Sequence, residues 1–303
     1  MNNPESELQA KIRQQFDAVT YPRVPVENSP QNEYELLFLH NLITPYYLRN
    51  QKVIETKGKV ILDAGCGSGY KALVLAMANP GAQIVGIDIS EKSVELARQR
   101  LQYHGFDNAE FHVLPIEELP SLGLEFDYIN NDEVLYLFPD IVVGLQAMKS
   151  VLKPDGIIRT NLHSSLQRHA IFRVQEMFQM MGLMNENPGE MEMEVARETF
   201  DALKDSIILK REVWKPERAK NEEWILSNYL LIGDKGYTIP EVFAALKSAN
   251  LEFISMLTWR QWEILDLFKS EDELPVFLGV GLSEISVEEL SLIHISEPTR
   301  LAE

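Results

Sequence analysis

Three glycines at alternate positions follow a short apolar run, and this spacing is the first pattern in the chain that suggests chemistry. The stretch reads VILDAGCGSGY and contains Gly65, Gly67 and Gly69. Glycine permits positive φ angles and lets a ligand touch the backbone where a Cβ atom would collide with it. Such a turn can cradle a pyrophosphate at a helix N-terminus or pack against a nucleoside.

The spacing of the glycines discriminates between these classes of ligand. A nicotinamide or flavin fingerprint requires Gly or Ala at position 70, where this chain has Tyr70. A Walker loop also fails, because Lys71 does not end a Gly-x-x-x-x-Gly-Lys run with Ser or Thr behind it. What remains is Asp-x-Gly-x-Gly-x-Gly, which begins at Asp63. This pattern favours a ligand that meets bare backbone.

Short apolar runs alternate with helical patterns from residue 57 onward, and these elements must position the glycines. Strands are predicted at KVILDA, QIVGID, AEFHVL, FDYIN and GIIRTNL. Helices are predicted at residues 71–78 and 139–152. A third helix is predicted to begin after Ser90, which caps it, and to turn Val94, Ala97 and Leu101 toward the core. The alternation predicts a doubly wound, mostly parallel α/β sheet with helices on both faces. Such sheets bind ligands at the carboxyl ends of their strands.

Five segments make up the predicted organisation. Residues 1–56 form an N-terminal helical segment, 57–163 the core, and 164–236 a helical insertion or lid with helices at 164–184, 190–205 and 221–232. Residues 237–289 return to the core as a helix followed by a strand, with a final strand at PVFLGVGL. Residues 290–303 begin LSLIHISEPTR, which resembles a translated sequencing adapter, so we expect an artefact in which His294 has no function.

The composition excludes several kinds of partner. The formal charge is −18, which argues against a surface built to bind nucleic acid phosphates. The single cysteine, Cys66, cannot form an internal disulfide, and the histidines show no ligand spacing, so no metal site is expected. The N-terminus is polar and acidic, and no apolar run is long enough to span a bilayer. We therefore expect a cytoplasmic protein without a membrane partner.

Four motifs in order resemble those of the class I S-adenosylmethionine-dependent methyltransferases. They are VILDAGCGSG, IVGIDIS, FDYINNDEVLYL and LKPDGIIRT, and together they cover about residues 57–162. The resemblance implies a Rossmann-like fold in which residues 57–163 bind S-adenosyl-L-methionine. Two positions depart from the family pattern: Asp155 replaces a more usual glycine, and Pro115 stands where an acidic residue often follows the third strand.

The resemblance also implies a set of residues around the cofactor. Asp88 would accept hydrogen bonds from both ribose hydroxyls, Ile89 would lie beside the adenine, and Asn131 would stand at the turn against the cofactor. The complete set carried over comprises Asp63, Ala64, Gly65, Cys66, Gly67, Gly69, Asp88, Ile89, Ile116, Glu117 and Asn131. The alternative is that the glycines only turn the chain and that Asp88 caps the following helix.

Methyl transfer from a sulfonium is an in-line displacement, so alignment and exclusion of water supply much of its acceleration. Holding two reactants in place is worth roughly 7 to 11 kcal/mol, and a dedicated base is optional. The weak candidates for a base are Asp132, Tyr136 and His163, which follow the fourth and fifth strands. A structural role is favoured for His163, and a helix-start role for the neighbouring Glu133.

Two further regions are candidates for the substrate side. Tyr21, Pro22 and Arg23 form a rigid segment that either folds over the cofactor, with Arg23 pairing a carboxylate, or lies in solvent. Six methionines crowd the insertion, and a helical core is expected for Met177, Met180, Met181 and Met184, with an adaptable apolar pocket as the alternative. Trp214 and Trp224 either line that pocket or anchor the insertion.

We therefore expect an S-adenosylmethionine-dependent methyltransferase that acts on a small molecule. The alternatives are a protein methyltransferase and a non-catalytic module that binds S-adenosylmethionine as a structural or sensed ligand. The sequence does not give the methyl acceptor or the oligomeric state.

Overall fold

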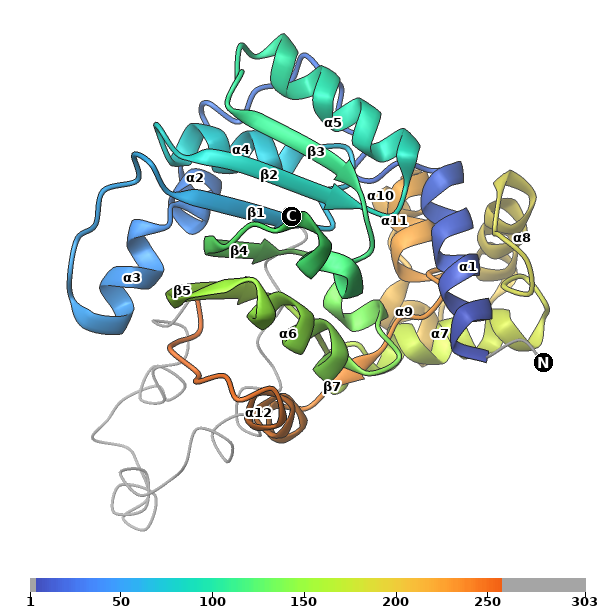
Figure 1. Cartoon of the computed structure of the whole chain (residues 1–303). Helices are drawn as coiled ribbons and strands as arrows, with labels where there is room; N and C mark the ends of the chain where they lie inside the picture. Colours follow the sequence, from blue (N-terminus) through green and yellow to red (C-terminus); the bar gives the residue numbers. More distant parts are fainter. Residues whose placement is uncertain (1–3, 258–303) are drawn as a thin grey trace, which may run out of the picture.

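A five-stranded parallel sheet forms the centre of the computed structural model, which describes residues 4–257 (Figure 1). Its order is β3-β2-β1-β4-β5. The strands are β1 (Val60–Ala64), β2 (Gln83–Asp88), β3 (Ala109–Val113), β4 (Phe126–Asn131) and β5 (Leu152–Thr160). The order reverses between β1 and β4, where open α/β sheets bind ligands. The predicted α/β fold class is confirmed.

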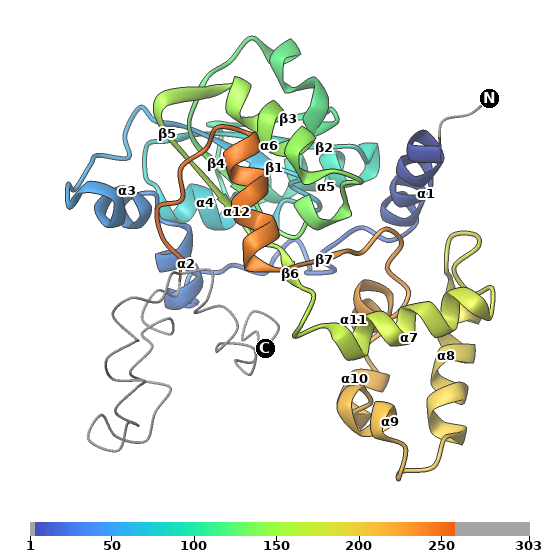
Figure 2. The same cartoon turned by 90° about the horizontal axis from the view of Figure 1, so that it is seen from below.

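Helices cover both faces of the sheet. One face carries α4 (Tyr70–Ala78) and α5 (Glu91–Tyr103), and the other carries η1 (Ile116–Leu122), α6 (Ile141–Ser150) and α12 (Ile239–Ser248) (Figures 1 and 2). Successive β1 residues serve the two faces, because Ile61 belongs to one apolar core and Leu62 to the other.

Helix α5 begins and packs as the sequence predicts. The hydroxyl of Ser90 accepts a hydrogen bond from the Ser93 N–H at 3.2 Å and so caps the helix. Val94, Ala97 and Leu101 are buried on its inward face.

The N-terminal helices are α1 (Pro4–Ala18), α2 (Tyr34–His40) and α3 (Ile43–Asn50). The predicted N-terminal helical segment thus contains three helices, and the Asn41 backbone is extended between α2 and α3. Helix α1 packs away from the sheet, against the insertion. Gln15 links the two through its side chain, which donates to the Leu230 carbonyl at 2.8 Å and accepts from the Ile232 N–H at 3.1 Å.

The insertion contains five helices and is closed at its base by two short strands. The helices are α7 (His169–Met180), α8 (Glu190–Ala202), α9 (Ile208–Val213), α10 (Pro216–Ala219) and α11 (Glu222–Asn228). Strand β6 (His163–Ser164) pairs in parallel with β7 (Gly236–Tyr237), which brings the ends of the insertion together. Figure 2 shows helices α7 to α11 gathered beside α1, apart from the sheet.

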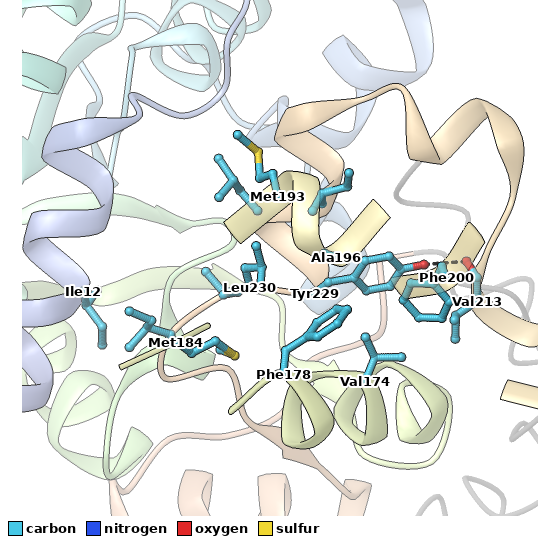
Figure 3. Close-up of a cluster of buried hydrophobic side chains, with 14 of the residues drawn as sticks. Ile12, Val174, Phe178, Met184, Met193, Ala196, Phe200, Val213, Tyr229 and Leu230 are labelled. Carbon is cyan, nitrogen blue, oxygen red and sulfur yellow. Dashed lines mark hydrogen bonds between the residues drawn. The ribbon is translucent and has the colours of Figure 1, made fainter. Parts of the chain in front are cut away.

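Aromatic rings form the centre of the insertion's own core (Figure 3). Phe178, Phe200 and Tyr229 are fully buried there. Trp214 stacks on Phe200 with the ring centroids 4.7 Å apart, and Trp224 meets the Tyr229 ring edge-on at the same separation. Both tryptophans therefore anchor the insertion, which was one of the two alternatives open from the sequence.

The prediction that four methionines share this core is wrong for two of them. Met180 is 78% exposed and Met181 48% exposed: Met180 is the last residue of α7, two positions after the buried Phe178 and so on another side of the helix, and Met181 is the residue that caps the helix C-terminus. Met177 and Met184 do pack against the aromatic core. Met184 is also among the residues that line an open cavity of about 430 Å³ between α7 and residues 231–236.

The strand predicted behind α12 is not formed at residues 251–257, which have no regular secondary structure. Leu251 packs against the core on one face of the sheet and Ile254 against the core on the other. The segment therefore crosses from one apolar layer to the other instead of pairing with a strand. The predicted strand at residues 275–282 and the tail at 290–303 lie outside the described residues.

Candidate functional site

The glycine loop joins β1 to α4, and all three of its alternate glycines have positive φ. The angles are +83° at Gly65, +49° at Gly67 and +79° at Gly69. This conformation is costly for any residue with a Cβ atom. The loop is tied to β2, since the N–H groups of Gly65 and Cys66 both donate to the Ile87 carbonyl at 2.8 Å.

Protein segments from three directions pack against the same glycines. A Cβ atom at Gly65 would overlap the side chain of Val134, and one at Gly67 would overlap the Tyr21 carbonyl oxygen. At Gly69 a Cβ would lie 2.6 Å from the backbone of Ala97 in α5. The glycines therefore serve close packing as well as turning the chain.

Asp88 ends β2 and connects the second strand to the glycine loop. Its carboxylate accepts from the Gly67 N–H at 2.9 Å through one oxygen and from the Ser90 N–H at 2.9 Å through the other. Burial raises the pKa of this carboxyl. Ser90 itself provides the side-chain cap of α5, so Asp88 does not take the capping role considered as an alternative. A carboxylate has about four acceptor sites, so Asp88 can also accept from hydroxyl donors.

Asp63 lies near the end of β1, and one of its two carboxylate oxygens is hydrogen bonded. The side-chain amide of Asn130 donates to Oδ1 at 2.8 Å, whereas the buried Oδ2 has no hydrogen-bond partner among residues 4–257. The residue is 2% exposed, and burial raises the pKa of Asp63 to about 7. A buried unpaired acceptor calls for a donor. S-adenosylmethionine carries donors of both kinds that this site could use. Its ammonium group fits the acceptor on Asp63, and its two ribose hydroxyls fit the carboxylate of Asp88.

The other residues assigned to the cofactor are engaged in different ways. Asn131 is fully buried; its amide donates to the Ala64 carbonyl at 2.8 Å and its oxygen accepts from the Thr160 hydroxyl at 3.0 Å. Ile116 is 5% exposed in a sheet-face core, and the Glu117 carboxylate accepts from Gln9 at 2.9 Å. Ile89 is partly buried against the core that joins α1 to the insertion. Cofactor contacts of these residues stay predictions.

Arg100 is a buried cation in this region whose role the sequence reasoning missed. Its guanidinium donates to the Ser68 carbonyl in the glycine loop at 2.9 Å. It also donates to the carbonyls of Val24 and Pro25 at 2.6 and 2.7 Å. The sequence could have predicted this burial, because Arg100 adjoins Leu101 and stands three positions after Ala97, both on the inward face of α5. We call residues 19–33 the N-terminal strap, which Arg100 fastens to the loop.

The strap also reaches the insertion. The Ser68 N–H donates to the Tyr21 carbonyl at 2.8 Å, which holds the strap against the glycine loop. Two residues later, the Arg23 N–H donates to Glu223 at 3.1 Å, and its guanidinium pairs with Glu222 at 3.0 Å. Both glutamates belong to α11. Arg23 thus pairs a carboxylate of α11 and links the loop to the insertion, whereas the position of the strap over the cofactor stays a prediction.

Asp132, one of the candidate bases, is paired with two cations and one histidine. It forms ion pairs with Arg159 from β5 and with Lys71 at 3.4 Å. It also lies 3.1 Å from Nε2 of His40, whose pKa is lowered by burial. Burial alone would raise the pKa of Asp132, but these partners hold it well below its usual range. The geometry favours a structural ion pair here.

His163, Tyr136 and Glu133 form a second cluster at the ends of β4 and β5. The Tyr136 and His163 rings stack with their centroids 3.7 Å apart. Glu133 Oε2 accepts from the Tyr136 hydroxyl at 3.0 Å and lies 3.5 Å from His163 Nε2. The other ring nitrogen, Nδ1, lies 2.6 Å from a carboxylate oxygen of Asp234.

The sequence analysis gave one member of this cluster a different role and did not identify another. Glu133 is not a helix-start carboxylate, because its own φ is +60° and its side chain is bonded within the cluster. Asp234 was missed, since it comes from the end of the insertion, 71 positions from His163; its side chain is fully buried. Its flanking by glycines in IGDKG was the only local signal.

Comparisons with known proteins identify a methyltransferase domain in this chain. A protein-family model described as a methyltransferase domain matches residues 55–223. An uncharacterized protein of Synechococcus sp. is 30% identical over 277 residues, which cover 89% of this chain and 65% of that protein. A ubiquinone biosynthesis O-methyltransferase of Actinobacillus pleuropneumoniae is 32% identical over 134 residues, covering 43% of this chain and 56% of the relative. The chain thus spans roughly half to two thirds of these relatives.

Among solved structures, PKMT2 from Rickettsia typhi in complex with AdoHcy is similar with a TM-score of 0.68. The sequence identity is 20%, and the likeness covers 86% of this chain and 51% of that one, so it concerns the fold. Within residues 4–257, no helix is both long and apolar enough to cross a membrane. The same residues contain no group of three or more His, Cys, Asp or Glu side chains placed to hold a metal ion.

Proposed function

We propose, from the premise that the chain belongs to the S-adenosylmethionine-dependent methyltransferase family, that it transfers the methyl group of this cofactor to a small molecule. The family model covers more than half of the chain, and the motifs read from the sequence lie within it. The resemblance stated from the sequence is thereby confirmed at the level of the family. The methyl acceptor is the part of the function that is proposed.

One observation carries the assignment of the cofactor site. Asp88 is hydrogen bonded to the glycine loop through Gly67, and the buried Asp63 Oδ2 beside this loop lacks a partner among the described residues. Bound S-adenosylmethionine supplies an electrophilic methyl group on a sulfonium. The acceptors of Asp63 and Asp88 would hold its ammonium group and its ribose hydroxyls.

The rest of the chain would align the acceptor and exclude water. The strap contacts the glycine loop at Tyr21 and the insertion at Arg23, so it spans the two parts of the molecule. We propose that residues 164–236 act as the lid over residues 57–163 and shape the acceptor site. Alignment of this kind supplies much of the acceleration of a displacement reaction.

A small acceptor is supported by charge and by relatives. The formal charge of −18 disfavours nucleic acid as the acceptor. Two relatives named as ubiquinone biosynthesis O-methyltransferases share 32% identity over 134 residues and 33% identity over 100 residues. They match less than half of this chain, so they support the proposal without identifying the acceptor.

The test supplies the protein with S-adenosylmethionine and with two fractions of a bacterial extract, a protein-free metabolite filtrate and the desalted proteins. We expect S-adenosylhomocysteine to form with the filtrate. Formation with the protein fraction alone would assign a protein acceptor. Binding of the cofactor without product in either fraction would identify a non-catalytic binding module.

A further inference from the structure

Glu133 has a backbone conformation that is uncommon outside glycine. Its φ is +60°, and such angles in other residues often mark functional positions. Asn161, just after β5, holds it on two sides. The Glu133 N–H donates to the Asn161 side-chain oxygen at 2.7 Å, and the Asn161 amide donates back to the Glu133 carboxylate. The conformation therefore fixes where this carboxylate stands.

Behind Glu133 a series of charged groups runs into the insertion. His163 bridges Glu133 and Asp234 through its two ring nitrogens, at 3.5 and 2.6 Å. The second oxygen of Asp234 accepts from Arg168 at 2.9 Å and from Gln175 at 2.8 Å. The Asp234 side chain is completely buried, whereas 33% of the Glu133 side chain is exposed. Glu133 is the accessible end of this relay.

The accessible end lies beside the proposed cofactor site. Val134, the next residue, packs directly against Gly65 of the glycine loop. The phenol of Tyr21 lies close enough that the charge of Glu133 helps to raise the pKa of this tyrosine, although burial is the larger cause. Glu133 thus adjoins both the loop that would hold the cofactor and the strap that packs on this loop.

We propose that Glu133 is the catalytic residue that accepts the proton of a hydroxyl acceptor, and that His163 and Asp234 are positioning residues for it. This inference rests on the proposed methyl transfer. The acceptor oxygen forms the new C–O bond while the C–S bond breaks, and sulfur keeps that electron pair as a neutral thioether. The proton of the hydroxyl passes to the Glu133 carboxylate, so charge and atoms balance.

The charges around Glu133 favour this role for an oxygen acceptor. Burial would raise the pKa of Glu133, but the bond and positive charge of His163 hold it below its usual range. Burial would lower the pKa of His163, but Asp234 and Glu133 raise it overall. Glu133 is therefore ionised and a weak base. A hydroxyl becomes strongly acidic as its oxygen is methylated, so a weak base suffices, whereas a methylated amine would keep its proton.

The first experiment uses cofactor labelled with ¹³C at the methyl group and the protein-free metabolite filtrate. We expect the wild type to give a product with the carbon chemical shift of an O-methyl group. Glu133→Gln should lower the rate about 10²- to 10⁴-fold. Its affinity for S-adenosylhomocysteine, measured by calorimetry, should be unchanged. Glu118→Gln changes an exposed carboxylate outside the Glu133–His163–Asp234 cluster; it is the matched control and should keep the wild-type rate.

The second experiment separates positioning from simple structural support. In Asp234→Asn, His163 loses the carboxylate that keeps it charged, so the acid limb of the pH–rate profile should move to higher pH as Glu133 becomes easier to protonate. The groups that face this pair are Asp132, Tyr136, Tyr21 and Arg168, and none of them is changed. A variant that only weakens the fold would lower the rate at every pH without moving the limb.

The outcomes are distinct. Products methylated only on nitrogen or sulfur, a fully active Glu133→Gln or an unmoved acid limb would overturn the role of Glu133 and leave the proposed function intact. Absence of S-adenosylhomocysteine with the wild type would overturn the proposed function and, with it, this inference.

Discussion

The Asp88 carboxylate accepts a hydrogen bond of 2.9 Å from the backbone N–H of Gly67. Asp88 ends β2, and Gly67 lies in the loop behind β1, so this bond fixes the two segments that would grip the cofactor. Gly67 itself has a positive φ, and its N–H donates to Asp88 in the same turn. The site is therefore held in shape by the protein's own contacts.

Gly67→Ala should destabilise the protein more than the same change at Gly105. Both glycines have positive φ, but a Cβ at Gly105 meets nothing within 4 Å, whereas one at Gly67 overlaps the Tyr21 carbonyl. The conformation alone costs about 1 to 2 kcal/mol, and the overlap should add about 1 to 3 kcal/mol. Urea unfolding of the two variants measures the difference. Equal losses would mean that the strap does not pack on this glycine.

Arg100→Met should loosen the strap. The substitution removes three hydrogen bonds from a buried guanidinium, to Ser68, Val24 and Pro25. We expect a loss of about 3 kcal/mol or more in the free energy of unfolding, because hydrogen bonds to charged groups are worth about 1.5 to 3 kcal/mol each.

Limited proteolysis should then cut the Arg100→Met variant within residues 19–33. Arg13→Met is the control, since Arg13 is exposed and, within the described part of the chain, forms only a surface ion pair of 3.7 Å with Asp17. The control should stay within about 0.5 kcal/mol of wild type. A strap that resists protease in the Arg100 variant would show that other contacts hold it.

Asp63→Asn should change how stability depends on pH. Burial raises the pKa of the folded carboxyl to about 7, so the folded protein keeps this proton while the unfolded chain has already lost it. The group therefore contributes stability at low pH that is lost as the pH rises from about 4 to about 7. Without cofactor, the variant should gain stability relative to wild type across this range, by a few kcal/mol at most. Urea unfolding at pH 5 and pH 8 measures the gain, and a constant difference would contradict the raised pKa.

Much of the fold follows from local patterns in the sequence. Apolar runs between helical segments predict the five parallel strands, and Ser90 predicts the start of α5, because both depend on residues close together in the chain. The glycine spacing likewise predicts the positive φ angles at Gly65, Gly67 and Gly69.

Contacts between distant elements could not be predicted in the same way. Periodicity predicts which face of its own helix a residue occupies. It does not predict which side chain of another element will contact that residue. Asp234 reaches His163 across 71 positions, and Arg100 reaches Pro25 across 75. Met180 and Met181 show the same limit, since the sequence did not reveal that α7 ends at Met180 with these two side chains exposed.

Calorimetry with S-adenosylhomocysteine tests the central claim, that the glycine loop and Asp88 hold an adenosyl cofactor, most directly. The wild type should bind with micromolar affinity and should not bind NAD. Asp88→Ala, checked to be folded by its thermal unfolding, should bind more weakly by about 2 kcal/mol or more, because hydrogen bonds to a charged group are lost. Equal affinity in the variant, or binding of NAD by the wild type, would contradict the claim.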